Sequence, residues 1–416
     1  MISLNKKLNF SKLVKNAIII LIISLLLITL PEIILRIVSH EKLSDIIPTS
    51  TYEFNKDYGY VLKASIETST KRNKGDIIVW KTNKNSFRGA ELKDNPEKRI
   101  IVYGDSNIQA EFSILENTFT AKLGKYLNSS GLKDIEVVNA GTIGFGPDQN
   151  LLRFINEAKL YNPYLVIFHV FADNDFGDIL RNRLFSLDEK GELIDSGYKF
   201  TIDEFKRERN RTLKRYYLNN LLTAKIIKKF FQSFKKKKNA GREEKRIEEM
   251  PEDIYQARSA AEYLNYKEAR PRKWELSWDH YDIDIALNPG QESSKIQIKL
   301  MEAVLKKANN FARSNGIEFL VLIQPSVVDL RKNNFNLNYE YLQKFPHYQK
   351  NNLTGAVERI CASNNINYIN LFDIFKNNNP DKLYFRAGDN HWNDKGQDFA
   401  AQVTASFVLN RYMLTD

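Results

Sequence analysis

The chain has few of the residues that form disulfides or bind transition metals. Among its 416 residues there is one cysteine, Cys361, and there are five histidines. A single cysteine excludes an intramolecular disulfide framework. No Cys/His cluster occurs, so the ligand spacing that predicts a zinc site is lacking. We therefore expect no metal site.

A general excess of basic charge is also lacking. The formal net charge is +11, but residues 206–249 hold 16 basic and 5 acidic residues, which accounts for the whole excess. The remainder of the chain is neutral. The sequence pI of about 9.3 therefore does not indicate a nucleic-acid-binding body, and we expect no nucleic-acid partner.

Charge is nearly absent from one stretch near the N-terminus. Residues 17–38 are mostly apolar and long enough to cross a bilayer core of about 30 Å. Lysines in residues 1–16 place this end in the cytoplasm under the positive-inside rule. No small-x-small cleavage site follows, which favours an uncleaved anchor over a cleaved signal peptide or a buried core helix. We expect a single-pass protein of the cytoplasmic (inner) membrane with an extracytoplasmic body.

The body alternates between strand-like and helical patterns. Near-continuous apolar runs predict strands at residues 99–103, 135–139, 164–171, 317–324 and 366–371. A period of 3.6 predicts helices at residues 118–127, 150–160 and 298–314. This alternation is typical of an α/β fold with a mostly parallel sheet covered on both faces. Ligand sites in such sheets lie outside the carboxyl ends of the strands.

These patterns divide the chain into successive segments. A lead-in of residues 39–98 contains short strand-like runs at 58–62 and 77–80 and precedes the first part of the α/β domain. The predicted boundaries are 1–16 for the cytoplasmic N-terminus, 17–38 for the anchor, 39–98 for the lead-in, 99–177 for the first part of the domain, 178–290 for an insertion and 291–416 for the second part.

The insertion is basic and partly helical. From Lys225 to Lys238, apolar residues and lysines alternate so that a helix would have one apolar and one basic face. Such a helix either packs on the domain with a solvated lysine face or contacts an anionic surface. Aromatic residues that could stack on sugar rings, or simply pack, are Trp274, Trp278 and Tyr281, together with Trp392 beyond the insertion.

A serine stands where a nucleophile is expected. Ser106 follows the strand 99–103 after Gly104-Asp105, so its hydroxyl lies at a strand-to-helix turn. It needs a base, and His391, with Asp389 two residues before it, is the best candidate. The other histidines are His40 beside the anchor, His169 inside a strand, and His280 and His347 without an accompanying pattern. Of these, His280 lies between two aspartates and is the fallback.

Two further segments offer hydrogen-bond donors for an oxyanion. The glycine-rich stretch 139–146 follows the second predicted strand and includes Gly144, whose N–H is not obstructed by a side chain. Asn174 follows the third strand and carries an amide that could donate, although an N-cap role for Asn174 or Asp173 is at least as plausible from the local sequence.

Together these segments resemble the SGNH (GDSL-type) hydrolase family. The blocks are Gly104-Asp105-Ser106, Asn139-x-Gly141-x-x-Gly144, Ala172-Asp173-Asn174-Asp175 and Asp389-x-His391. Asn107 stands where the family more often has an apolar residue, and Ala172 replaces a glycine. The single residue between Asp389 and His391 is similar to membrane-anchored branches that act in polysaccharide O-acetylation or deacetylation. The resemblance covers about residues 80–180 and 295–410.

The resemblance implies a flavodoxin-like three-layer α/β/α sandwich with a parallel five-stranded sheet in the order 2-1-3-4-5. It also implies a serine esterase without a cofactor. Ser106 would be the nucleophile, His391 the general base and Asp389 its orienting partner. The oxyanion hole would consist of the Ser106 N–H, the Gly144 N–H and the Asn174 amide.

We therefore expect a membrane-anchored esterase that acts on acyl esters, acetyl esters in the first place, of a glycan or cell-envelope substrate. A lipid ester is an alternative substrate. An O-acyltransferase using the same acyl-serine intermediate is an alternative activity. A third alternative is a non-catalytic glycan-binding or assembly component with the same fold.

Overall fold

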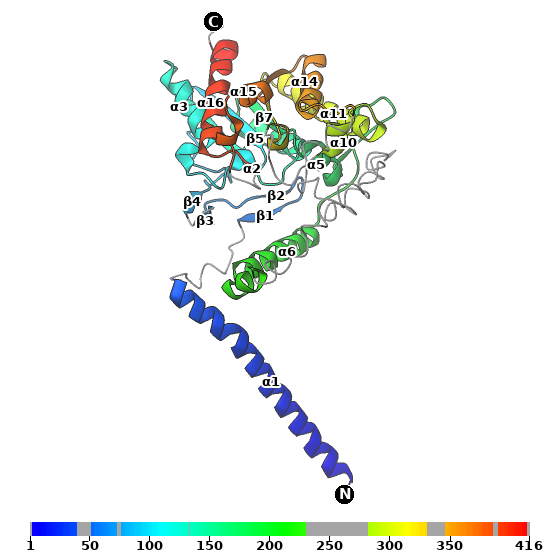
Figure 1. The fold of residues 1–416 in the computed structure, drawn as a ribbon. Helices are drawn as coiled ribbons and strands as arrows, with labels where there is room; N and C mark the ends of the chain where they lie inside the picture. The colour runs from blue at the N-terminus through cyan, green and yellow to red at the C-terminus, as the bar shows by residue number, and fades with distance from the viewer. Residues whose placement is uncertain are drawn as a thin grey trace. The chain divides into compact units, whose positions relative to one another are not determined.

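The computed structural model describes residues 2–39, 51–72, 76–132, 134–229, 282–330, 346–385 and 390–413. Contacts divide the chain into two units. One comprises Met1–Ser50 and Ile202–Glu249, and the other comprises Thr51–Thr201 and Met250–Asp416. The predicted insertion is thus shared between them, because α6 (Ile202–Asn220) is grouped with the N-terminal helix (Figure 1).

The larger unit is built on a parallel sheet. Within the described residues its five strands are β5 (Lys98–Gly104), β6 (Ile135–Gly141), β7 (Leu165–Phe171), β10 (Glu318–Gln324) and β11 (Asn367–Asn370). They lie in the order β6-β5-β7-β10-β11, which is 2-1-3-4-5 in chain order. All four ladders are parallel. The expected fold class and strand order are therefore confirmed.

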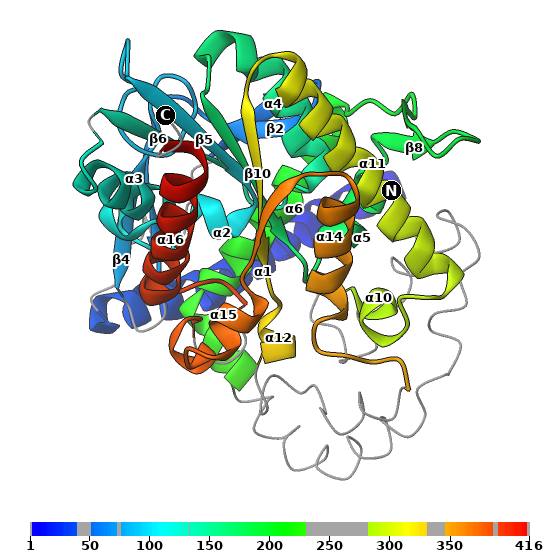
Figure 2. The ribbon, with the colours of Figure 1, turned by 90° about the horizontal axis from the view of Figure 1, so that it is seen from above.

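Two hydrophobic cores lie on opposite faces of this sheet. Side chains alternate between the faces, so Val166, Phe168 and Val170 of β7 enter one core while Leu165 and Ile167 enter the other. The first core is covered by α4 (Pro147–Tyr161), α5 (Asp175–Asn182), α10 (Ile283–Leu287), α11 (Glu292–Ser314) and α14 (Asn352–Ser363). The second is covered by α3 (Phe119–Ser129), α15 (Phe372–Lys376) and α16 (Asp394–Val408). Figure 2 shows α3 and α16 on one side of the strands and α4, α11 and α14 on the other.

The lead-in forms two antiparallel hairpins. One pairs β1 (Tyr52–Asn55) with β2 (Gly59–Leu62), and the other pairs β3 (Glu67–Lys71) with β4 (Ile77–Lys81). Strands had been expected at 58–62 and 77–80, and β2 and β4 confirm them. Tyr58 and Val61 pack against Phe145 of the loop after β6 in a separate small core. The lead-in is thus part of the domain and contacts a loop at the carboxyl end of the sheet.

Short elements complete the larger unit. They are α2 (Ser106–Gln109), the 3₁₀ turns Leu115–Asn117 and Pro380–Lys382, a hairpin of β8 (Phe185–Leu187) and β9 (Leu193–Asp195), α12 (Val327–Leu330) and a terminal π-helical turn, Leu409–Met413.

The smaller unit contains the long helix α1 (Ile2–Ser39). Its segment Val14–Ser39 is long and apolar enough to cross a membrane, a property that a signal sequence shares. Glu32 is buried in this helix and accepts hydrogen bonds from the backbone N–H groups of Leu222 and Thr223 and from Arg36 Nε. The carboxylate therefore caps the helical segment 222–229 and holds it against α1.

A buried carboxyl group in the larger unit predicts how stability depends on pH. Asp148 is fully buried at the start of α4, and its Oδ1 accepts a 2.9 Å hydrogen bond from Asn182 Nδ2. Burial raises the pKa of Asp148 to about 7. The folded state binds the Asp148 proton more tightly than the unfolded chain does, so this proton adds to the free energy of unfolding. The contribution is complete below about pH 4 and is lost as the pH rises through 7.

We expect Asp148→Asn to unfold at about the same temperature as wild type at pH 4, and at a higher temperature at pH 8. Asparagine keeps an acceptor for Asn182 but cannot ionise, so the gain at pH 8 should be roughly 2–4 kcal/mol. Thermal unfolding of the full-length protein in detergent from pH 4 to pH 9 measures this. A difference that does not vary with pH would contradict the assignment.

Candidate active site

Ser106 lies at a sharp junction between β5 and α2. Asp105 is the N-cap of α2, and its Oδ1 accepts a 2.8 Å hydrogen bond from Asn107 N. The strand ends at Gly104, where a Cβ would stand 2.5 Å from Ile108 Cγ1 and 2.9 Å from His169 Cβ. Only glycine fits there, so α2 can begin directly after the strand and present the Ser106 hydroxyl at the carboxyl end of the sheet.

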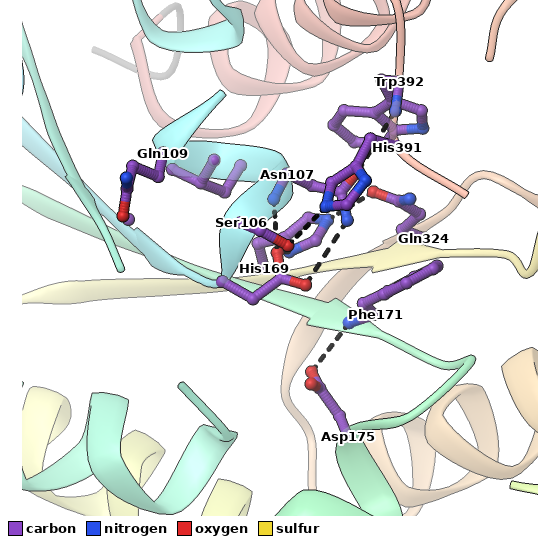
Figure 3. Close-up of polar contacts among 12 residues, drawn as sticks. Ser106, Asn107, Gln109, His169, Phe171, Asp175, Gln324, His391 and Trp392 are labelled. Carbon is purple, nitrogen blue, oxygen red and sulfur yellow. Dashed lines mark hydrogen bonds and ion pairs between the residues drawn. The ribbon is translucent and has the colours of Figure 1, made fainter. Parts of the chain in front are cut away.

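The structure brings His391 to this serine. His391 Nε2 lies 2.7 Å from Ser106 Oγ, although the two residues are 285 positions apart (Figure 3). The histidine lies just before α16. A hydrogen bond from Phe385 N to His391 O fixes the backbone of this segment. This contact is the geometry required of a serine and the base that takes its proton. Asp389, the predicted orienting residue, lies outside the described residues.

The predicted oxyanion donors lie on the loops that follow β6 and β7. Gly144 has a φ of +76°, a conformation that glycine adopts without strain. Asn174 is the N-cap residue of α5, and its Nδ2 donates 3.2 Å to Asp178 Oδ2. Among the described residues, neither Gly144 nor Asn174 is hydrogen-bonded to Ser106. Their role as donors to an oxyanion, together with that of the Ser106 N–H, stays a prediction.

Asn107 is a site residue whose role the sequence pattern did not reveal. It is fully buried, and its Oδ1 accepts a 3.2 Å hydrogen bond from Trp392 N. Its carbonyl accepts a 2.8 Å bond from Gln397 Nε2, and the Gln397 Oε1 accepts from Phe119 N. The residue after Ser106 thus connects directly to the residue after His391. The one sequence signal for this role was that Asn107 stands where the SGNH family more often has an apolar residue.

Trp392 is a packing residue. It is 1% exposed, and its ring lies 5.3 Å from that of His169, 5.7 Å from Phe375 and 6.2 Å from Phe119. A ring enclosed in this way cannot stack on a sugar, so of the two roles that the sequence left open for Trp392 the structure supports packing. The other three aromatic candidates, Trp274, Trp278 and Tyr281, lie outside the described residues.

A buried polar pair lies beneath Ser106. His169 Nδ1 is 3.5 Å from Asp105 Oδ1, and His169 Nε2 is 2.8 Å from Gln324 Oε1 (Figure 3). Burial lowers the pKa of His169, and the nearby Asp105 carboxylate opposes this effect in part. His169 is therefore a hydrogen-bonded histidine of the core, and it supports the turn that carries Ser106.

Arg88 from the lead-in supports the far end of α2. Its guanidinium donates to the carbonyl oxygens of Gln109, Ala110 and Ser113 and lies 5.4 Å from the ring centroid of Trp80. These carbonyls include groups that the short helix α2 leaves without an intrahelical partner. Burial lowers the pKa of Arg88 to about 10, which leaves it charged at neutral pH. The sequence offered no signal for this contact.

A small pocket opens beside the Ser106–His391 pair. Apart from these two residues, its walls are Asn107, Ala110, Phe112, Ser113, Phe385, Trp392 and Gln397. The Phe112 ring lies edge-on to both Phe385 and His391 at 5.9 Å. The space next to Ser106 is therefore bounded by the Phe112 and Phe385 rings together with polar side chains.

Comparisons with known proteins give structural matches only. No family model matches the chain, and no curated protein sequence matches it. The chain is similar to a lipase/acylhydrolase from Enterococcus faecalis at a TM-score of 0.37, with 11% identity over 76% of this chain and 96% of that one. It is similar to the acetyl xylan esterase AlAXEase at 0.35, with 14% identity over 74% and 99% of the chains. It is also similar to a member of the lipolytic G-D-S-L family from Veillonella parvula at 0.35, with 12% identity over 76% and 99%.

The contacts of Asn107 predict the effect of replacing it with leucine, the kind of residue more usual at this position. Asn107→Leu removes the hydrogen bond to Trp392 N and should displace His391 from Ser106. A misplacement of about 1 Å costs on the order of 100-fold in rate, so we expect fluorophosphonate labelling of Ser106 to slow about 10- to 100-fold.

Thermal unfolding of the same Asn107→Leu sample serves as the control, because a variant that has lost its fold would also label slowly. Labelling at the wild-type rate in a folded variant would show that other contacts suffice to hold the His391 segment.

Proposed function

We propose that this protein is a membrane-anchored serine esterase that acts on acyl esters of a glycan or cell-envelope substrate. The observation that carries the proposal is the 2.7 Å contact between Ser106 Oγ and His391 Nε2 at the carboxyl end of a 2-1-3-4-5 parallel sheet. The resemblance of the four sequence blocks to SGNH hydrolases supports the same activity. A partly buried serine paired with an imidazole has one common chemical use, which is attack on a carbonyl carbon.

In the first half-reaction, Ser106 Oγ attacks the ester carbonyl carbon while His391 Nε2 takes the hydroxyl proton. The resulting oxyanion is stabilised by the Ser106 and Gly144 N–H groups and the Asn174 amide. The intermediate collapses, the alkoxy group leaves with the proton from His391, and an acyl-serine remains. The Asn174 amide has two N–H donors, so one can remain on Asp178 while the other donates to this oxyanion.

In the second half-reaction, His391 removes a proton from a water molecule, which attacks the carbonyl carbon of the acyl-serine. The tetrahedral intermediate then collapses, the acid is released, and His391 returns the proton to Ser106 Oγ. A hydroxyl group of an acceptor in place of water would give an O-acyltransferase with the same residues. Asp389 is proposed to orient the imidazole and to stabilise its charged form, as in other triads.

The anchor is proposed to be α1. Its segment Val14–Ser39 contains 26 residues, about 39 Å of helix at 1.5 Å per residue, which exceeds the bilayer core. Lys12 and Lys15 precede or begin it, so the positive-inside rule directs the body outward. The site would then act at the envelope side of the cytoplasmic membrane.

A second membrane contact is proposed for the basic part of the insertion. Glu32 holds residues 222–229 against α1 near the end of the span, and Lys228 and Lys229 are exposed there beside the exposed Ile226 and Ile227. This composition suits the anionic headgroup region of a bilayer. The rest of the basic stretch up to Lys238 lies outside the described residues.

Replacing Ser106 tests the reaction class. We expect the full-length protein in detergent to hydrolyse p-nitrophenyl acetate and to form a fluorophosphonate adduct at Ser106. Both Ser106→Ala and His391→Gln should lower kcat at least about 1000-fold, because the nucleophile and its base act as a unit. Mass spectrometry of the labelled peptide locates the adduct.

A wild-type protein that hydrolyses no faster than Ser106→Ala, and that takes up no fluorophosphonate, would contradict the esterase. That result would favour a glycan-binding component with this fold.

The aromatic walls of the pocket predict a preference for short acyl groups. We expect kcat/KM to fall at least about tenfold from p-nitrophenyl acetate to p-nitrophenyl octanoate, and Phe112→Ala to reduce this difference by removing one wall. Tyr126→Phe, which changes a tyrosine that bonds to Asp398 away from the pocket, is the control. A preference for octanoate in the wild type would indicate a lipid ester instead of an acetylated glycan.

A further inference from the structure

The lead-in hairpin and the nucleophile helix both bind the loop that carries Gly144. The hydroxyl group of Tyr60, on β2, donates a 2.7 Å hydrogen bond to Ile143 O. Gln109, the last residue of α2, accepts a 2.9 Å bond from Ile143 N at its Oε1. The Gln109 amide is in turn hydrogen-bonded to the Tyr52 hydroxyl. Residue 143 is therefore held at both its N–H and its carbonyl, by two separate parts of the chain.

The carbonyl of Ile143 and the N–H of Gly144 belong to one peptide group. This group is planar and trans, so its C=O and N–H point in opposite directions. A hydrogen bond that fixes the Ile143 carbonyl therefore also fixes the direction of the Gly144 N–H. Donation to the carbonyl polarises the amide as well, which strengthens its N–H as a donor. Among the described residues, this N–H has no hydrogen-bond partner.

The loop fits closely against Tyr60. A Cβ placed on Gly144 would stand 2.9 Å from the Tyr60 hydroxyl oxygen, and the φ of +76° at Gly144 is itself unfavourable for other residues. The Tyr60 ring is fixed in turn by edge-on contacts with Phe145 at 5.2 Å and Tyr52 at 5.6 Å. These contacts restrict the Tyr60 ring and therefore fix the position of its hydroxyl group.

We propose that Tyr60 is a positioning residue of the oxyanion hole and that it sets the direction and donor strength of the Gly144 N–H. The inference rests on the proposed esterase function. It assigns to the lead-in, which lies outside the parallel sheet, a part in stabilising the transition state through the Gly144 N–H. Tyr60 itself does not touch the reacting atoms.

The test compares Tyr60→Phe with wild type in the full-length protein. The variant keeps the ring contacts and loses only the hydroxyl. We expect kcat for p-nitrophenyl acetate to fall about 5- to 50-fold, less than the 10²–10³ typical of deleting a donor outright, with KM within twofold. The rate of Ser106 modification by a fluorophosphonate should fall by a similar factor, because its phosphoryl oxygen occupies the same hole.

Tyr58→Phe is the matched control. Tyr58 packs on the same Phe145 ring at 6.1 Å, and its hydroxyl makes no hydrogen bond with the described residues. We expect this variant to keep wild-type kcat and labelling rate, and both variants to unfold near the wild-type temperature.

Two results would overturn the inference while the esterase stands. One is Tyr60→Phe with wild-type kcat and labelling rate. The other is an equal loss in Tyr60→Phe and Tyr58→Phe, accompanied by lower unfolding temperatures, which would assign Tyr60 to packing alone. A wild-type protein that is not labelled at Ser106 would instead remove the proposed function, and the inference with it.

Discussion

The site depends on one hydrogen bond between side chains that lie 285 residues apart, Ser106 Oγ and His391 Nε2. Residues next to Ser106 or His391 in the sequence cannot by themselves bring the two side chains together. Ser106 is positioned by the end of β5, a central strand, and His391 by the start of α16, which packs on the face of the sheet that also holds α3. The distance between Ser106 and His391 is therefore a consequence of how two layers of the sandwich pack, and an error in that packing would separate the pair.

The packing at this point is polar as well as apolar. Asn107 and Gln397 join the nucleophile turn to the His391 segment and to α3, and Asp105 and His169 lie directly beneath. Burying such groups is costly unless they are hydrogen-bonded, and a bonded group tolerates far less displacement than a methyl group does. The apolar contacts of Trp392 hold the His391 segment in the core. The hydrogen bonds to Asn107 determine where this segment lies along α2.

The sequence predicted the parts of this structure that are periodic or local. Five strand runs and three helical runs lie where they were expected, because burial on both faces leaves a continuous apolar signature. The strand order came from the resemblance of the four blocks. The contacts of Arg88, Asn107 and Tyr60 could not be predicted, since each joins segments whose approach is set by the tertiary fold. The role of Trp392 stayed open between stacking and packing, because an aromatic beside a site residue has the same local signal whether buried or exposed.

The charge around the site also follows from burial. Asp105 and Asp175 follow neighbouring strands, and a negative charge on both would oppose the oxyanion that the proposed reaction forms. Asp175 is 1% exposed, and its Oδ2 accepts a 2.8 Å hydrogen bond from Phe171 N. Burial, followed by the charges of Asp105 and Asp178, raises the pKa of Asp175 well above its usual value. Burial therefore disfavours a negative charge on this carboxyl group, which caps the end of β7.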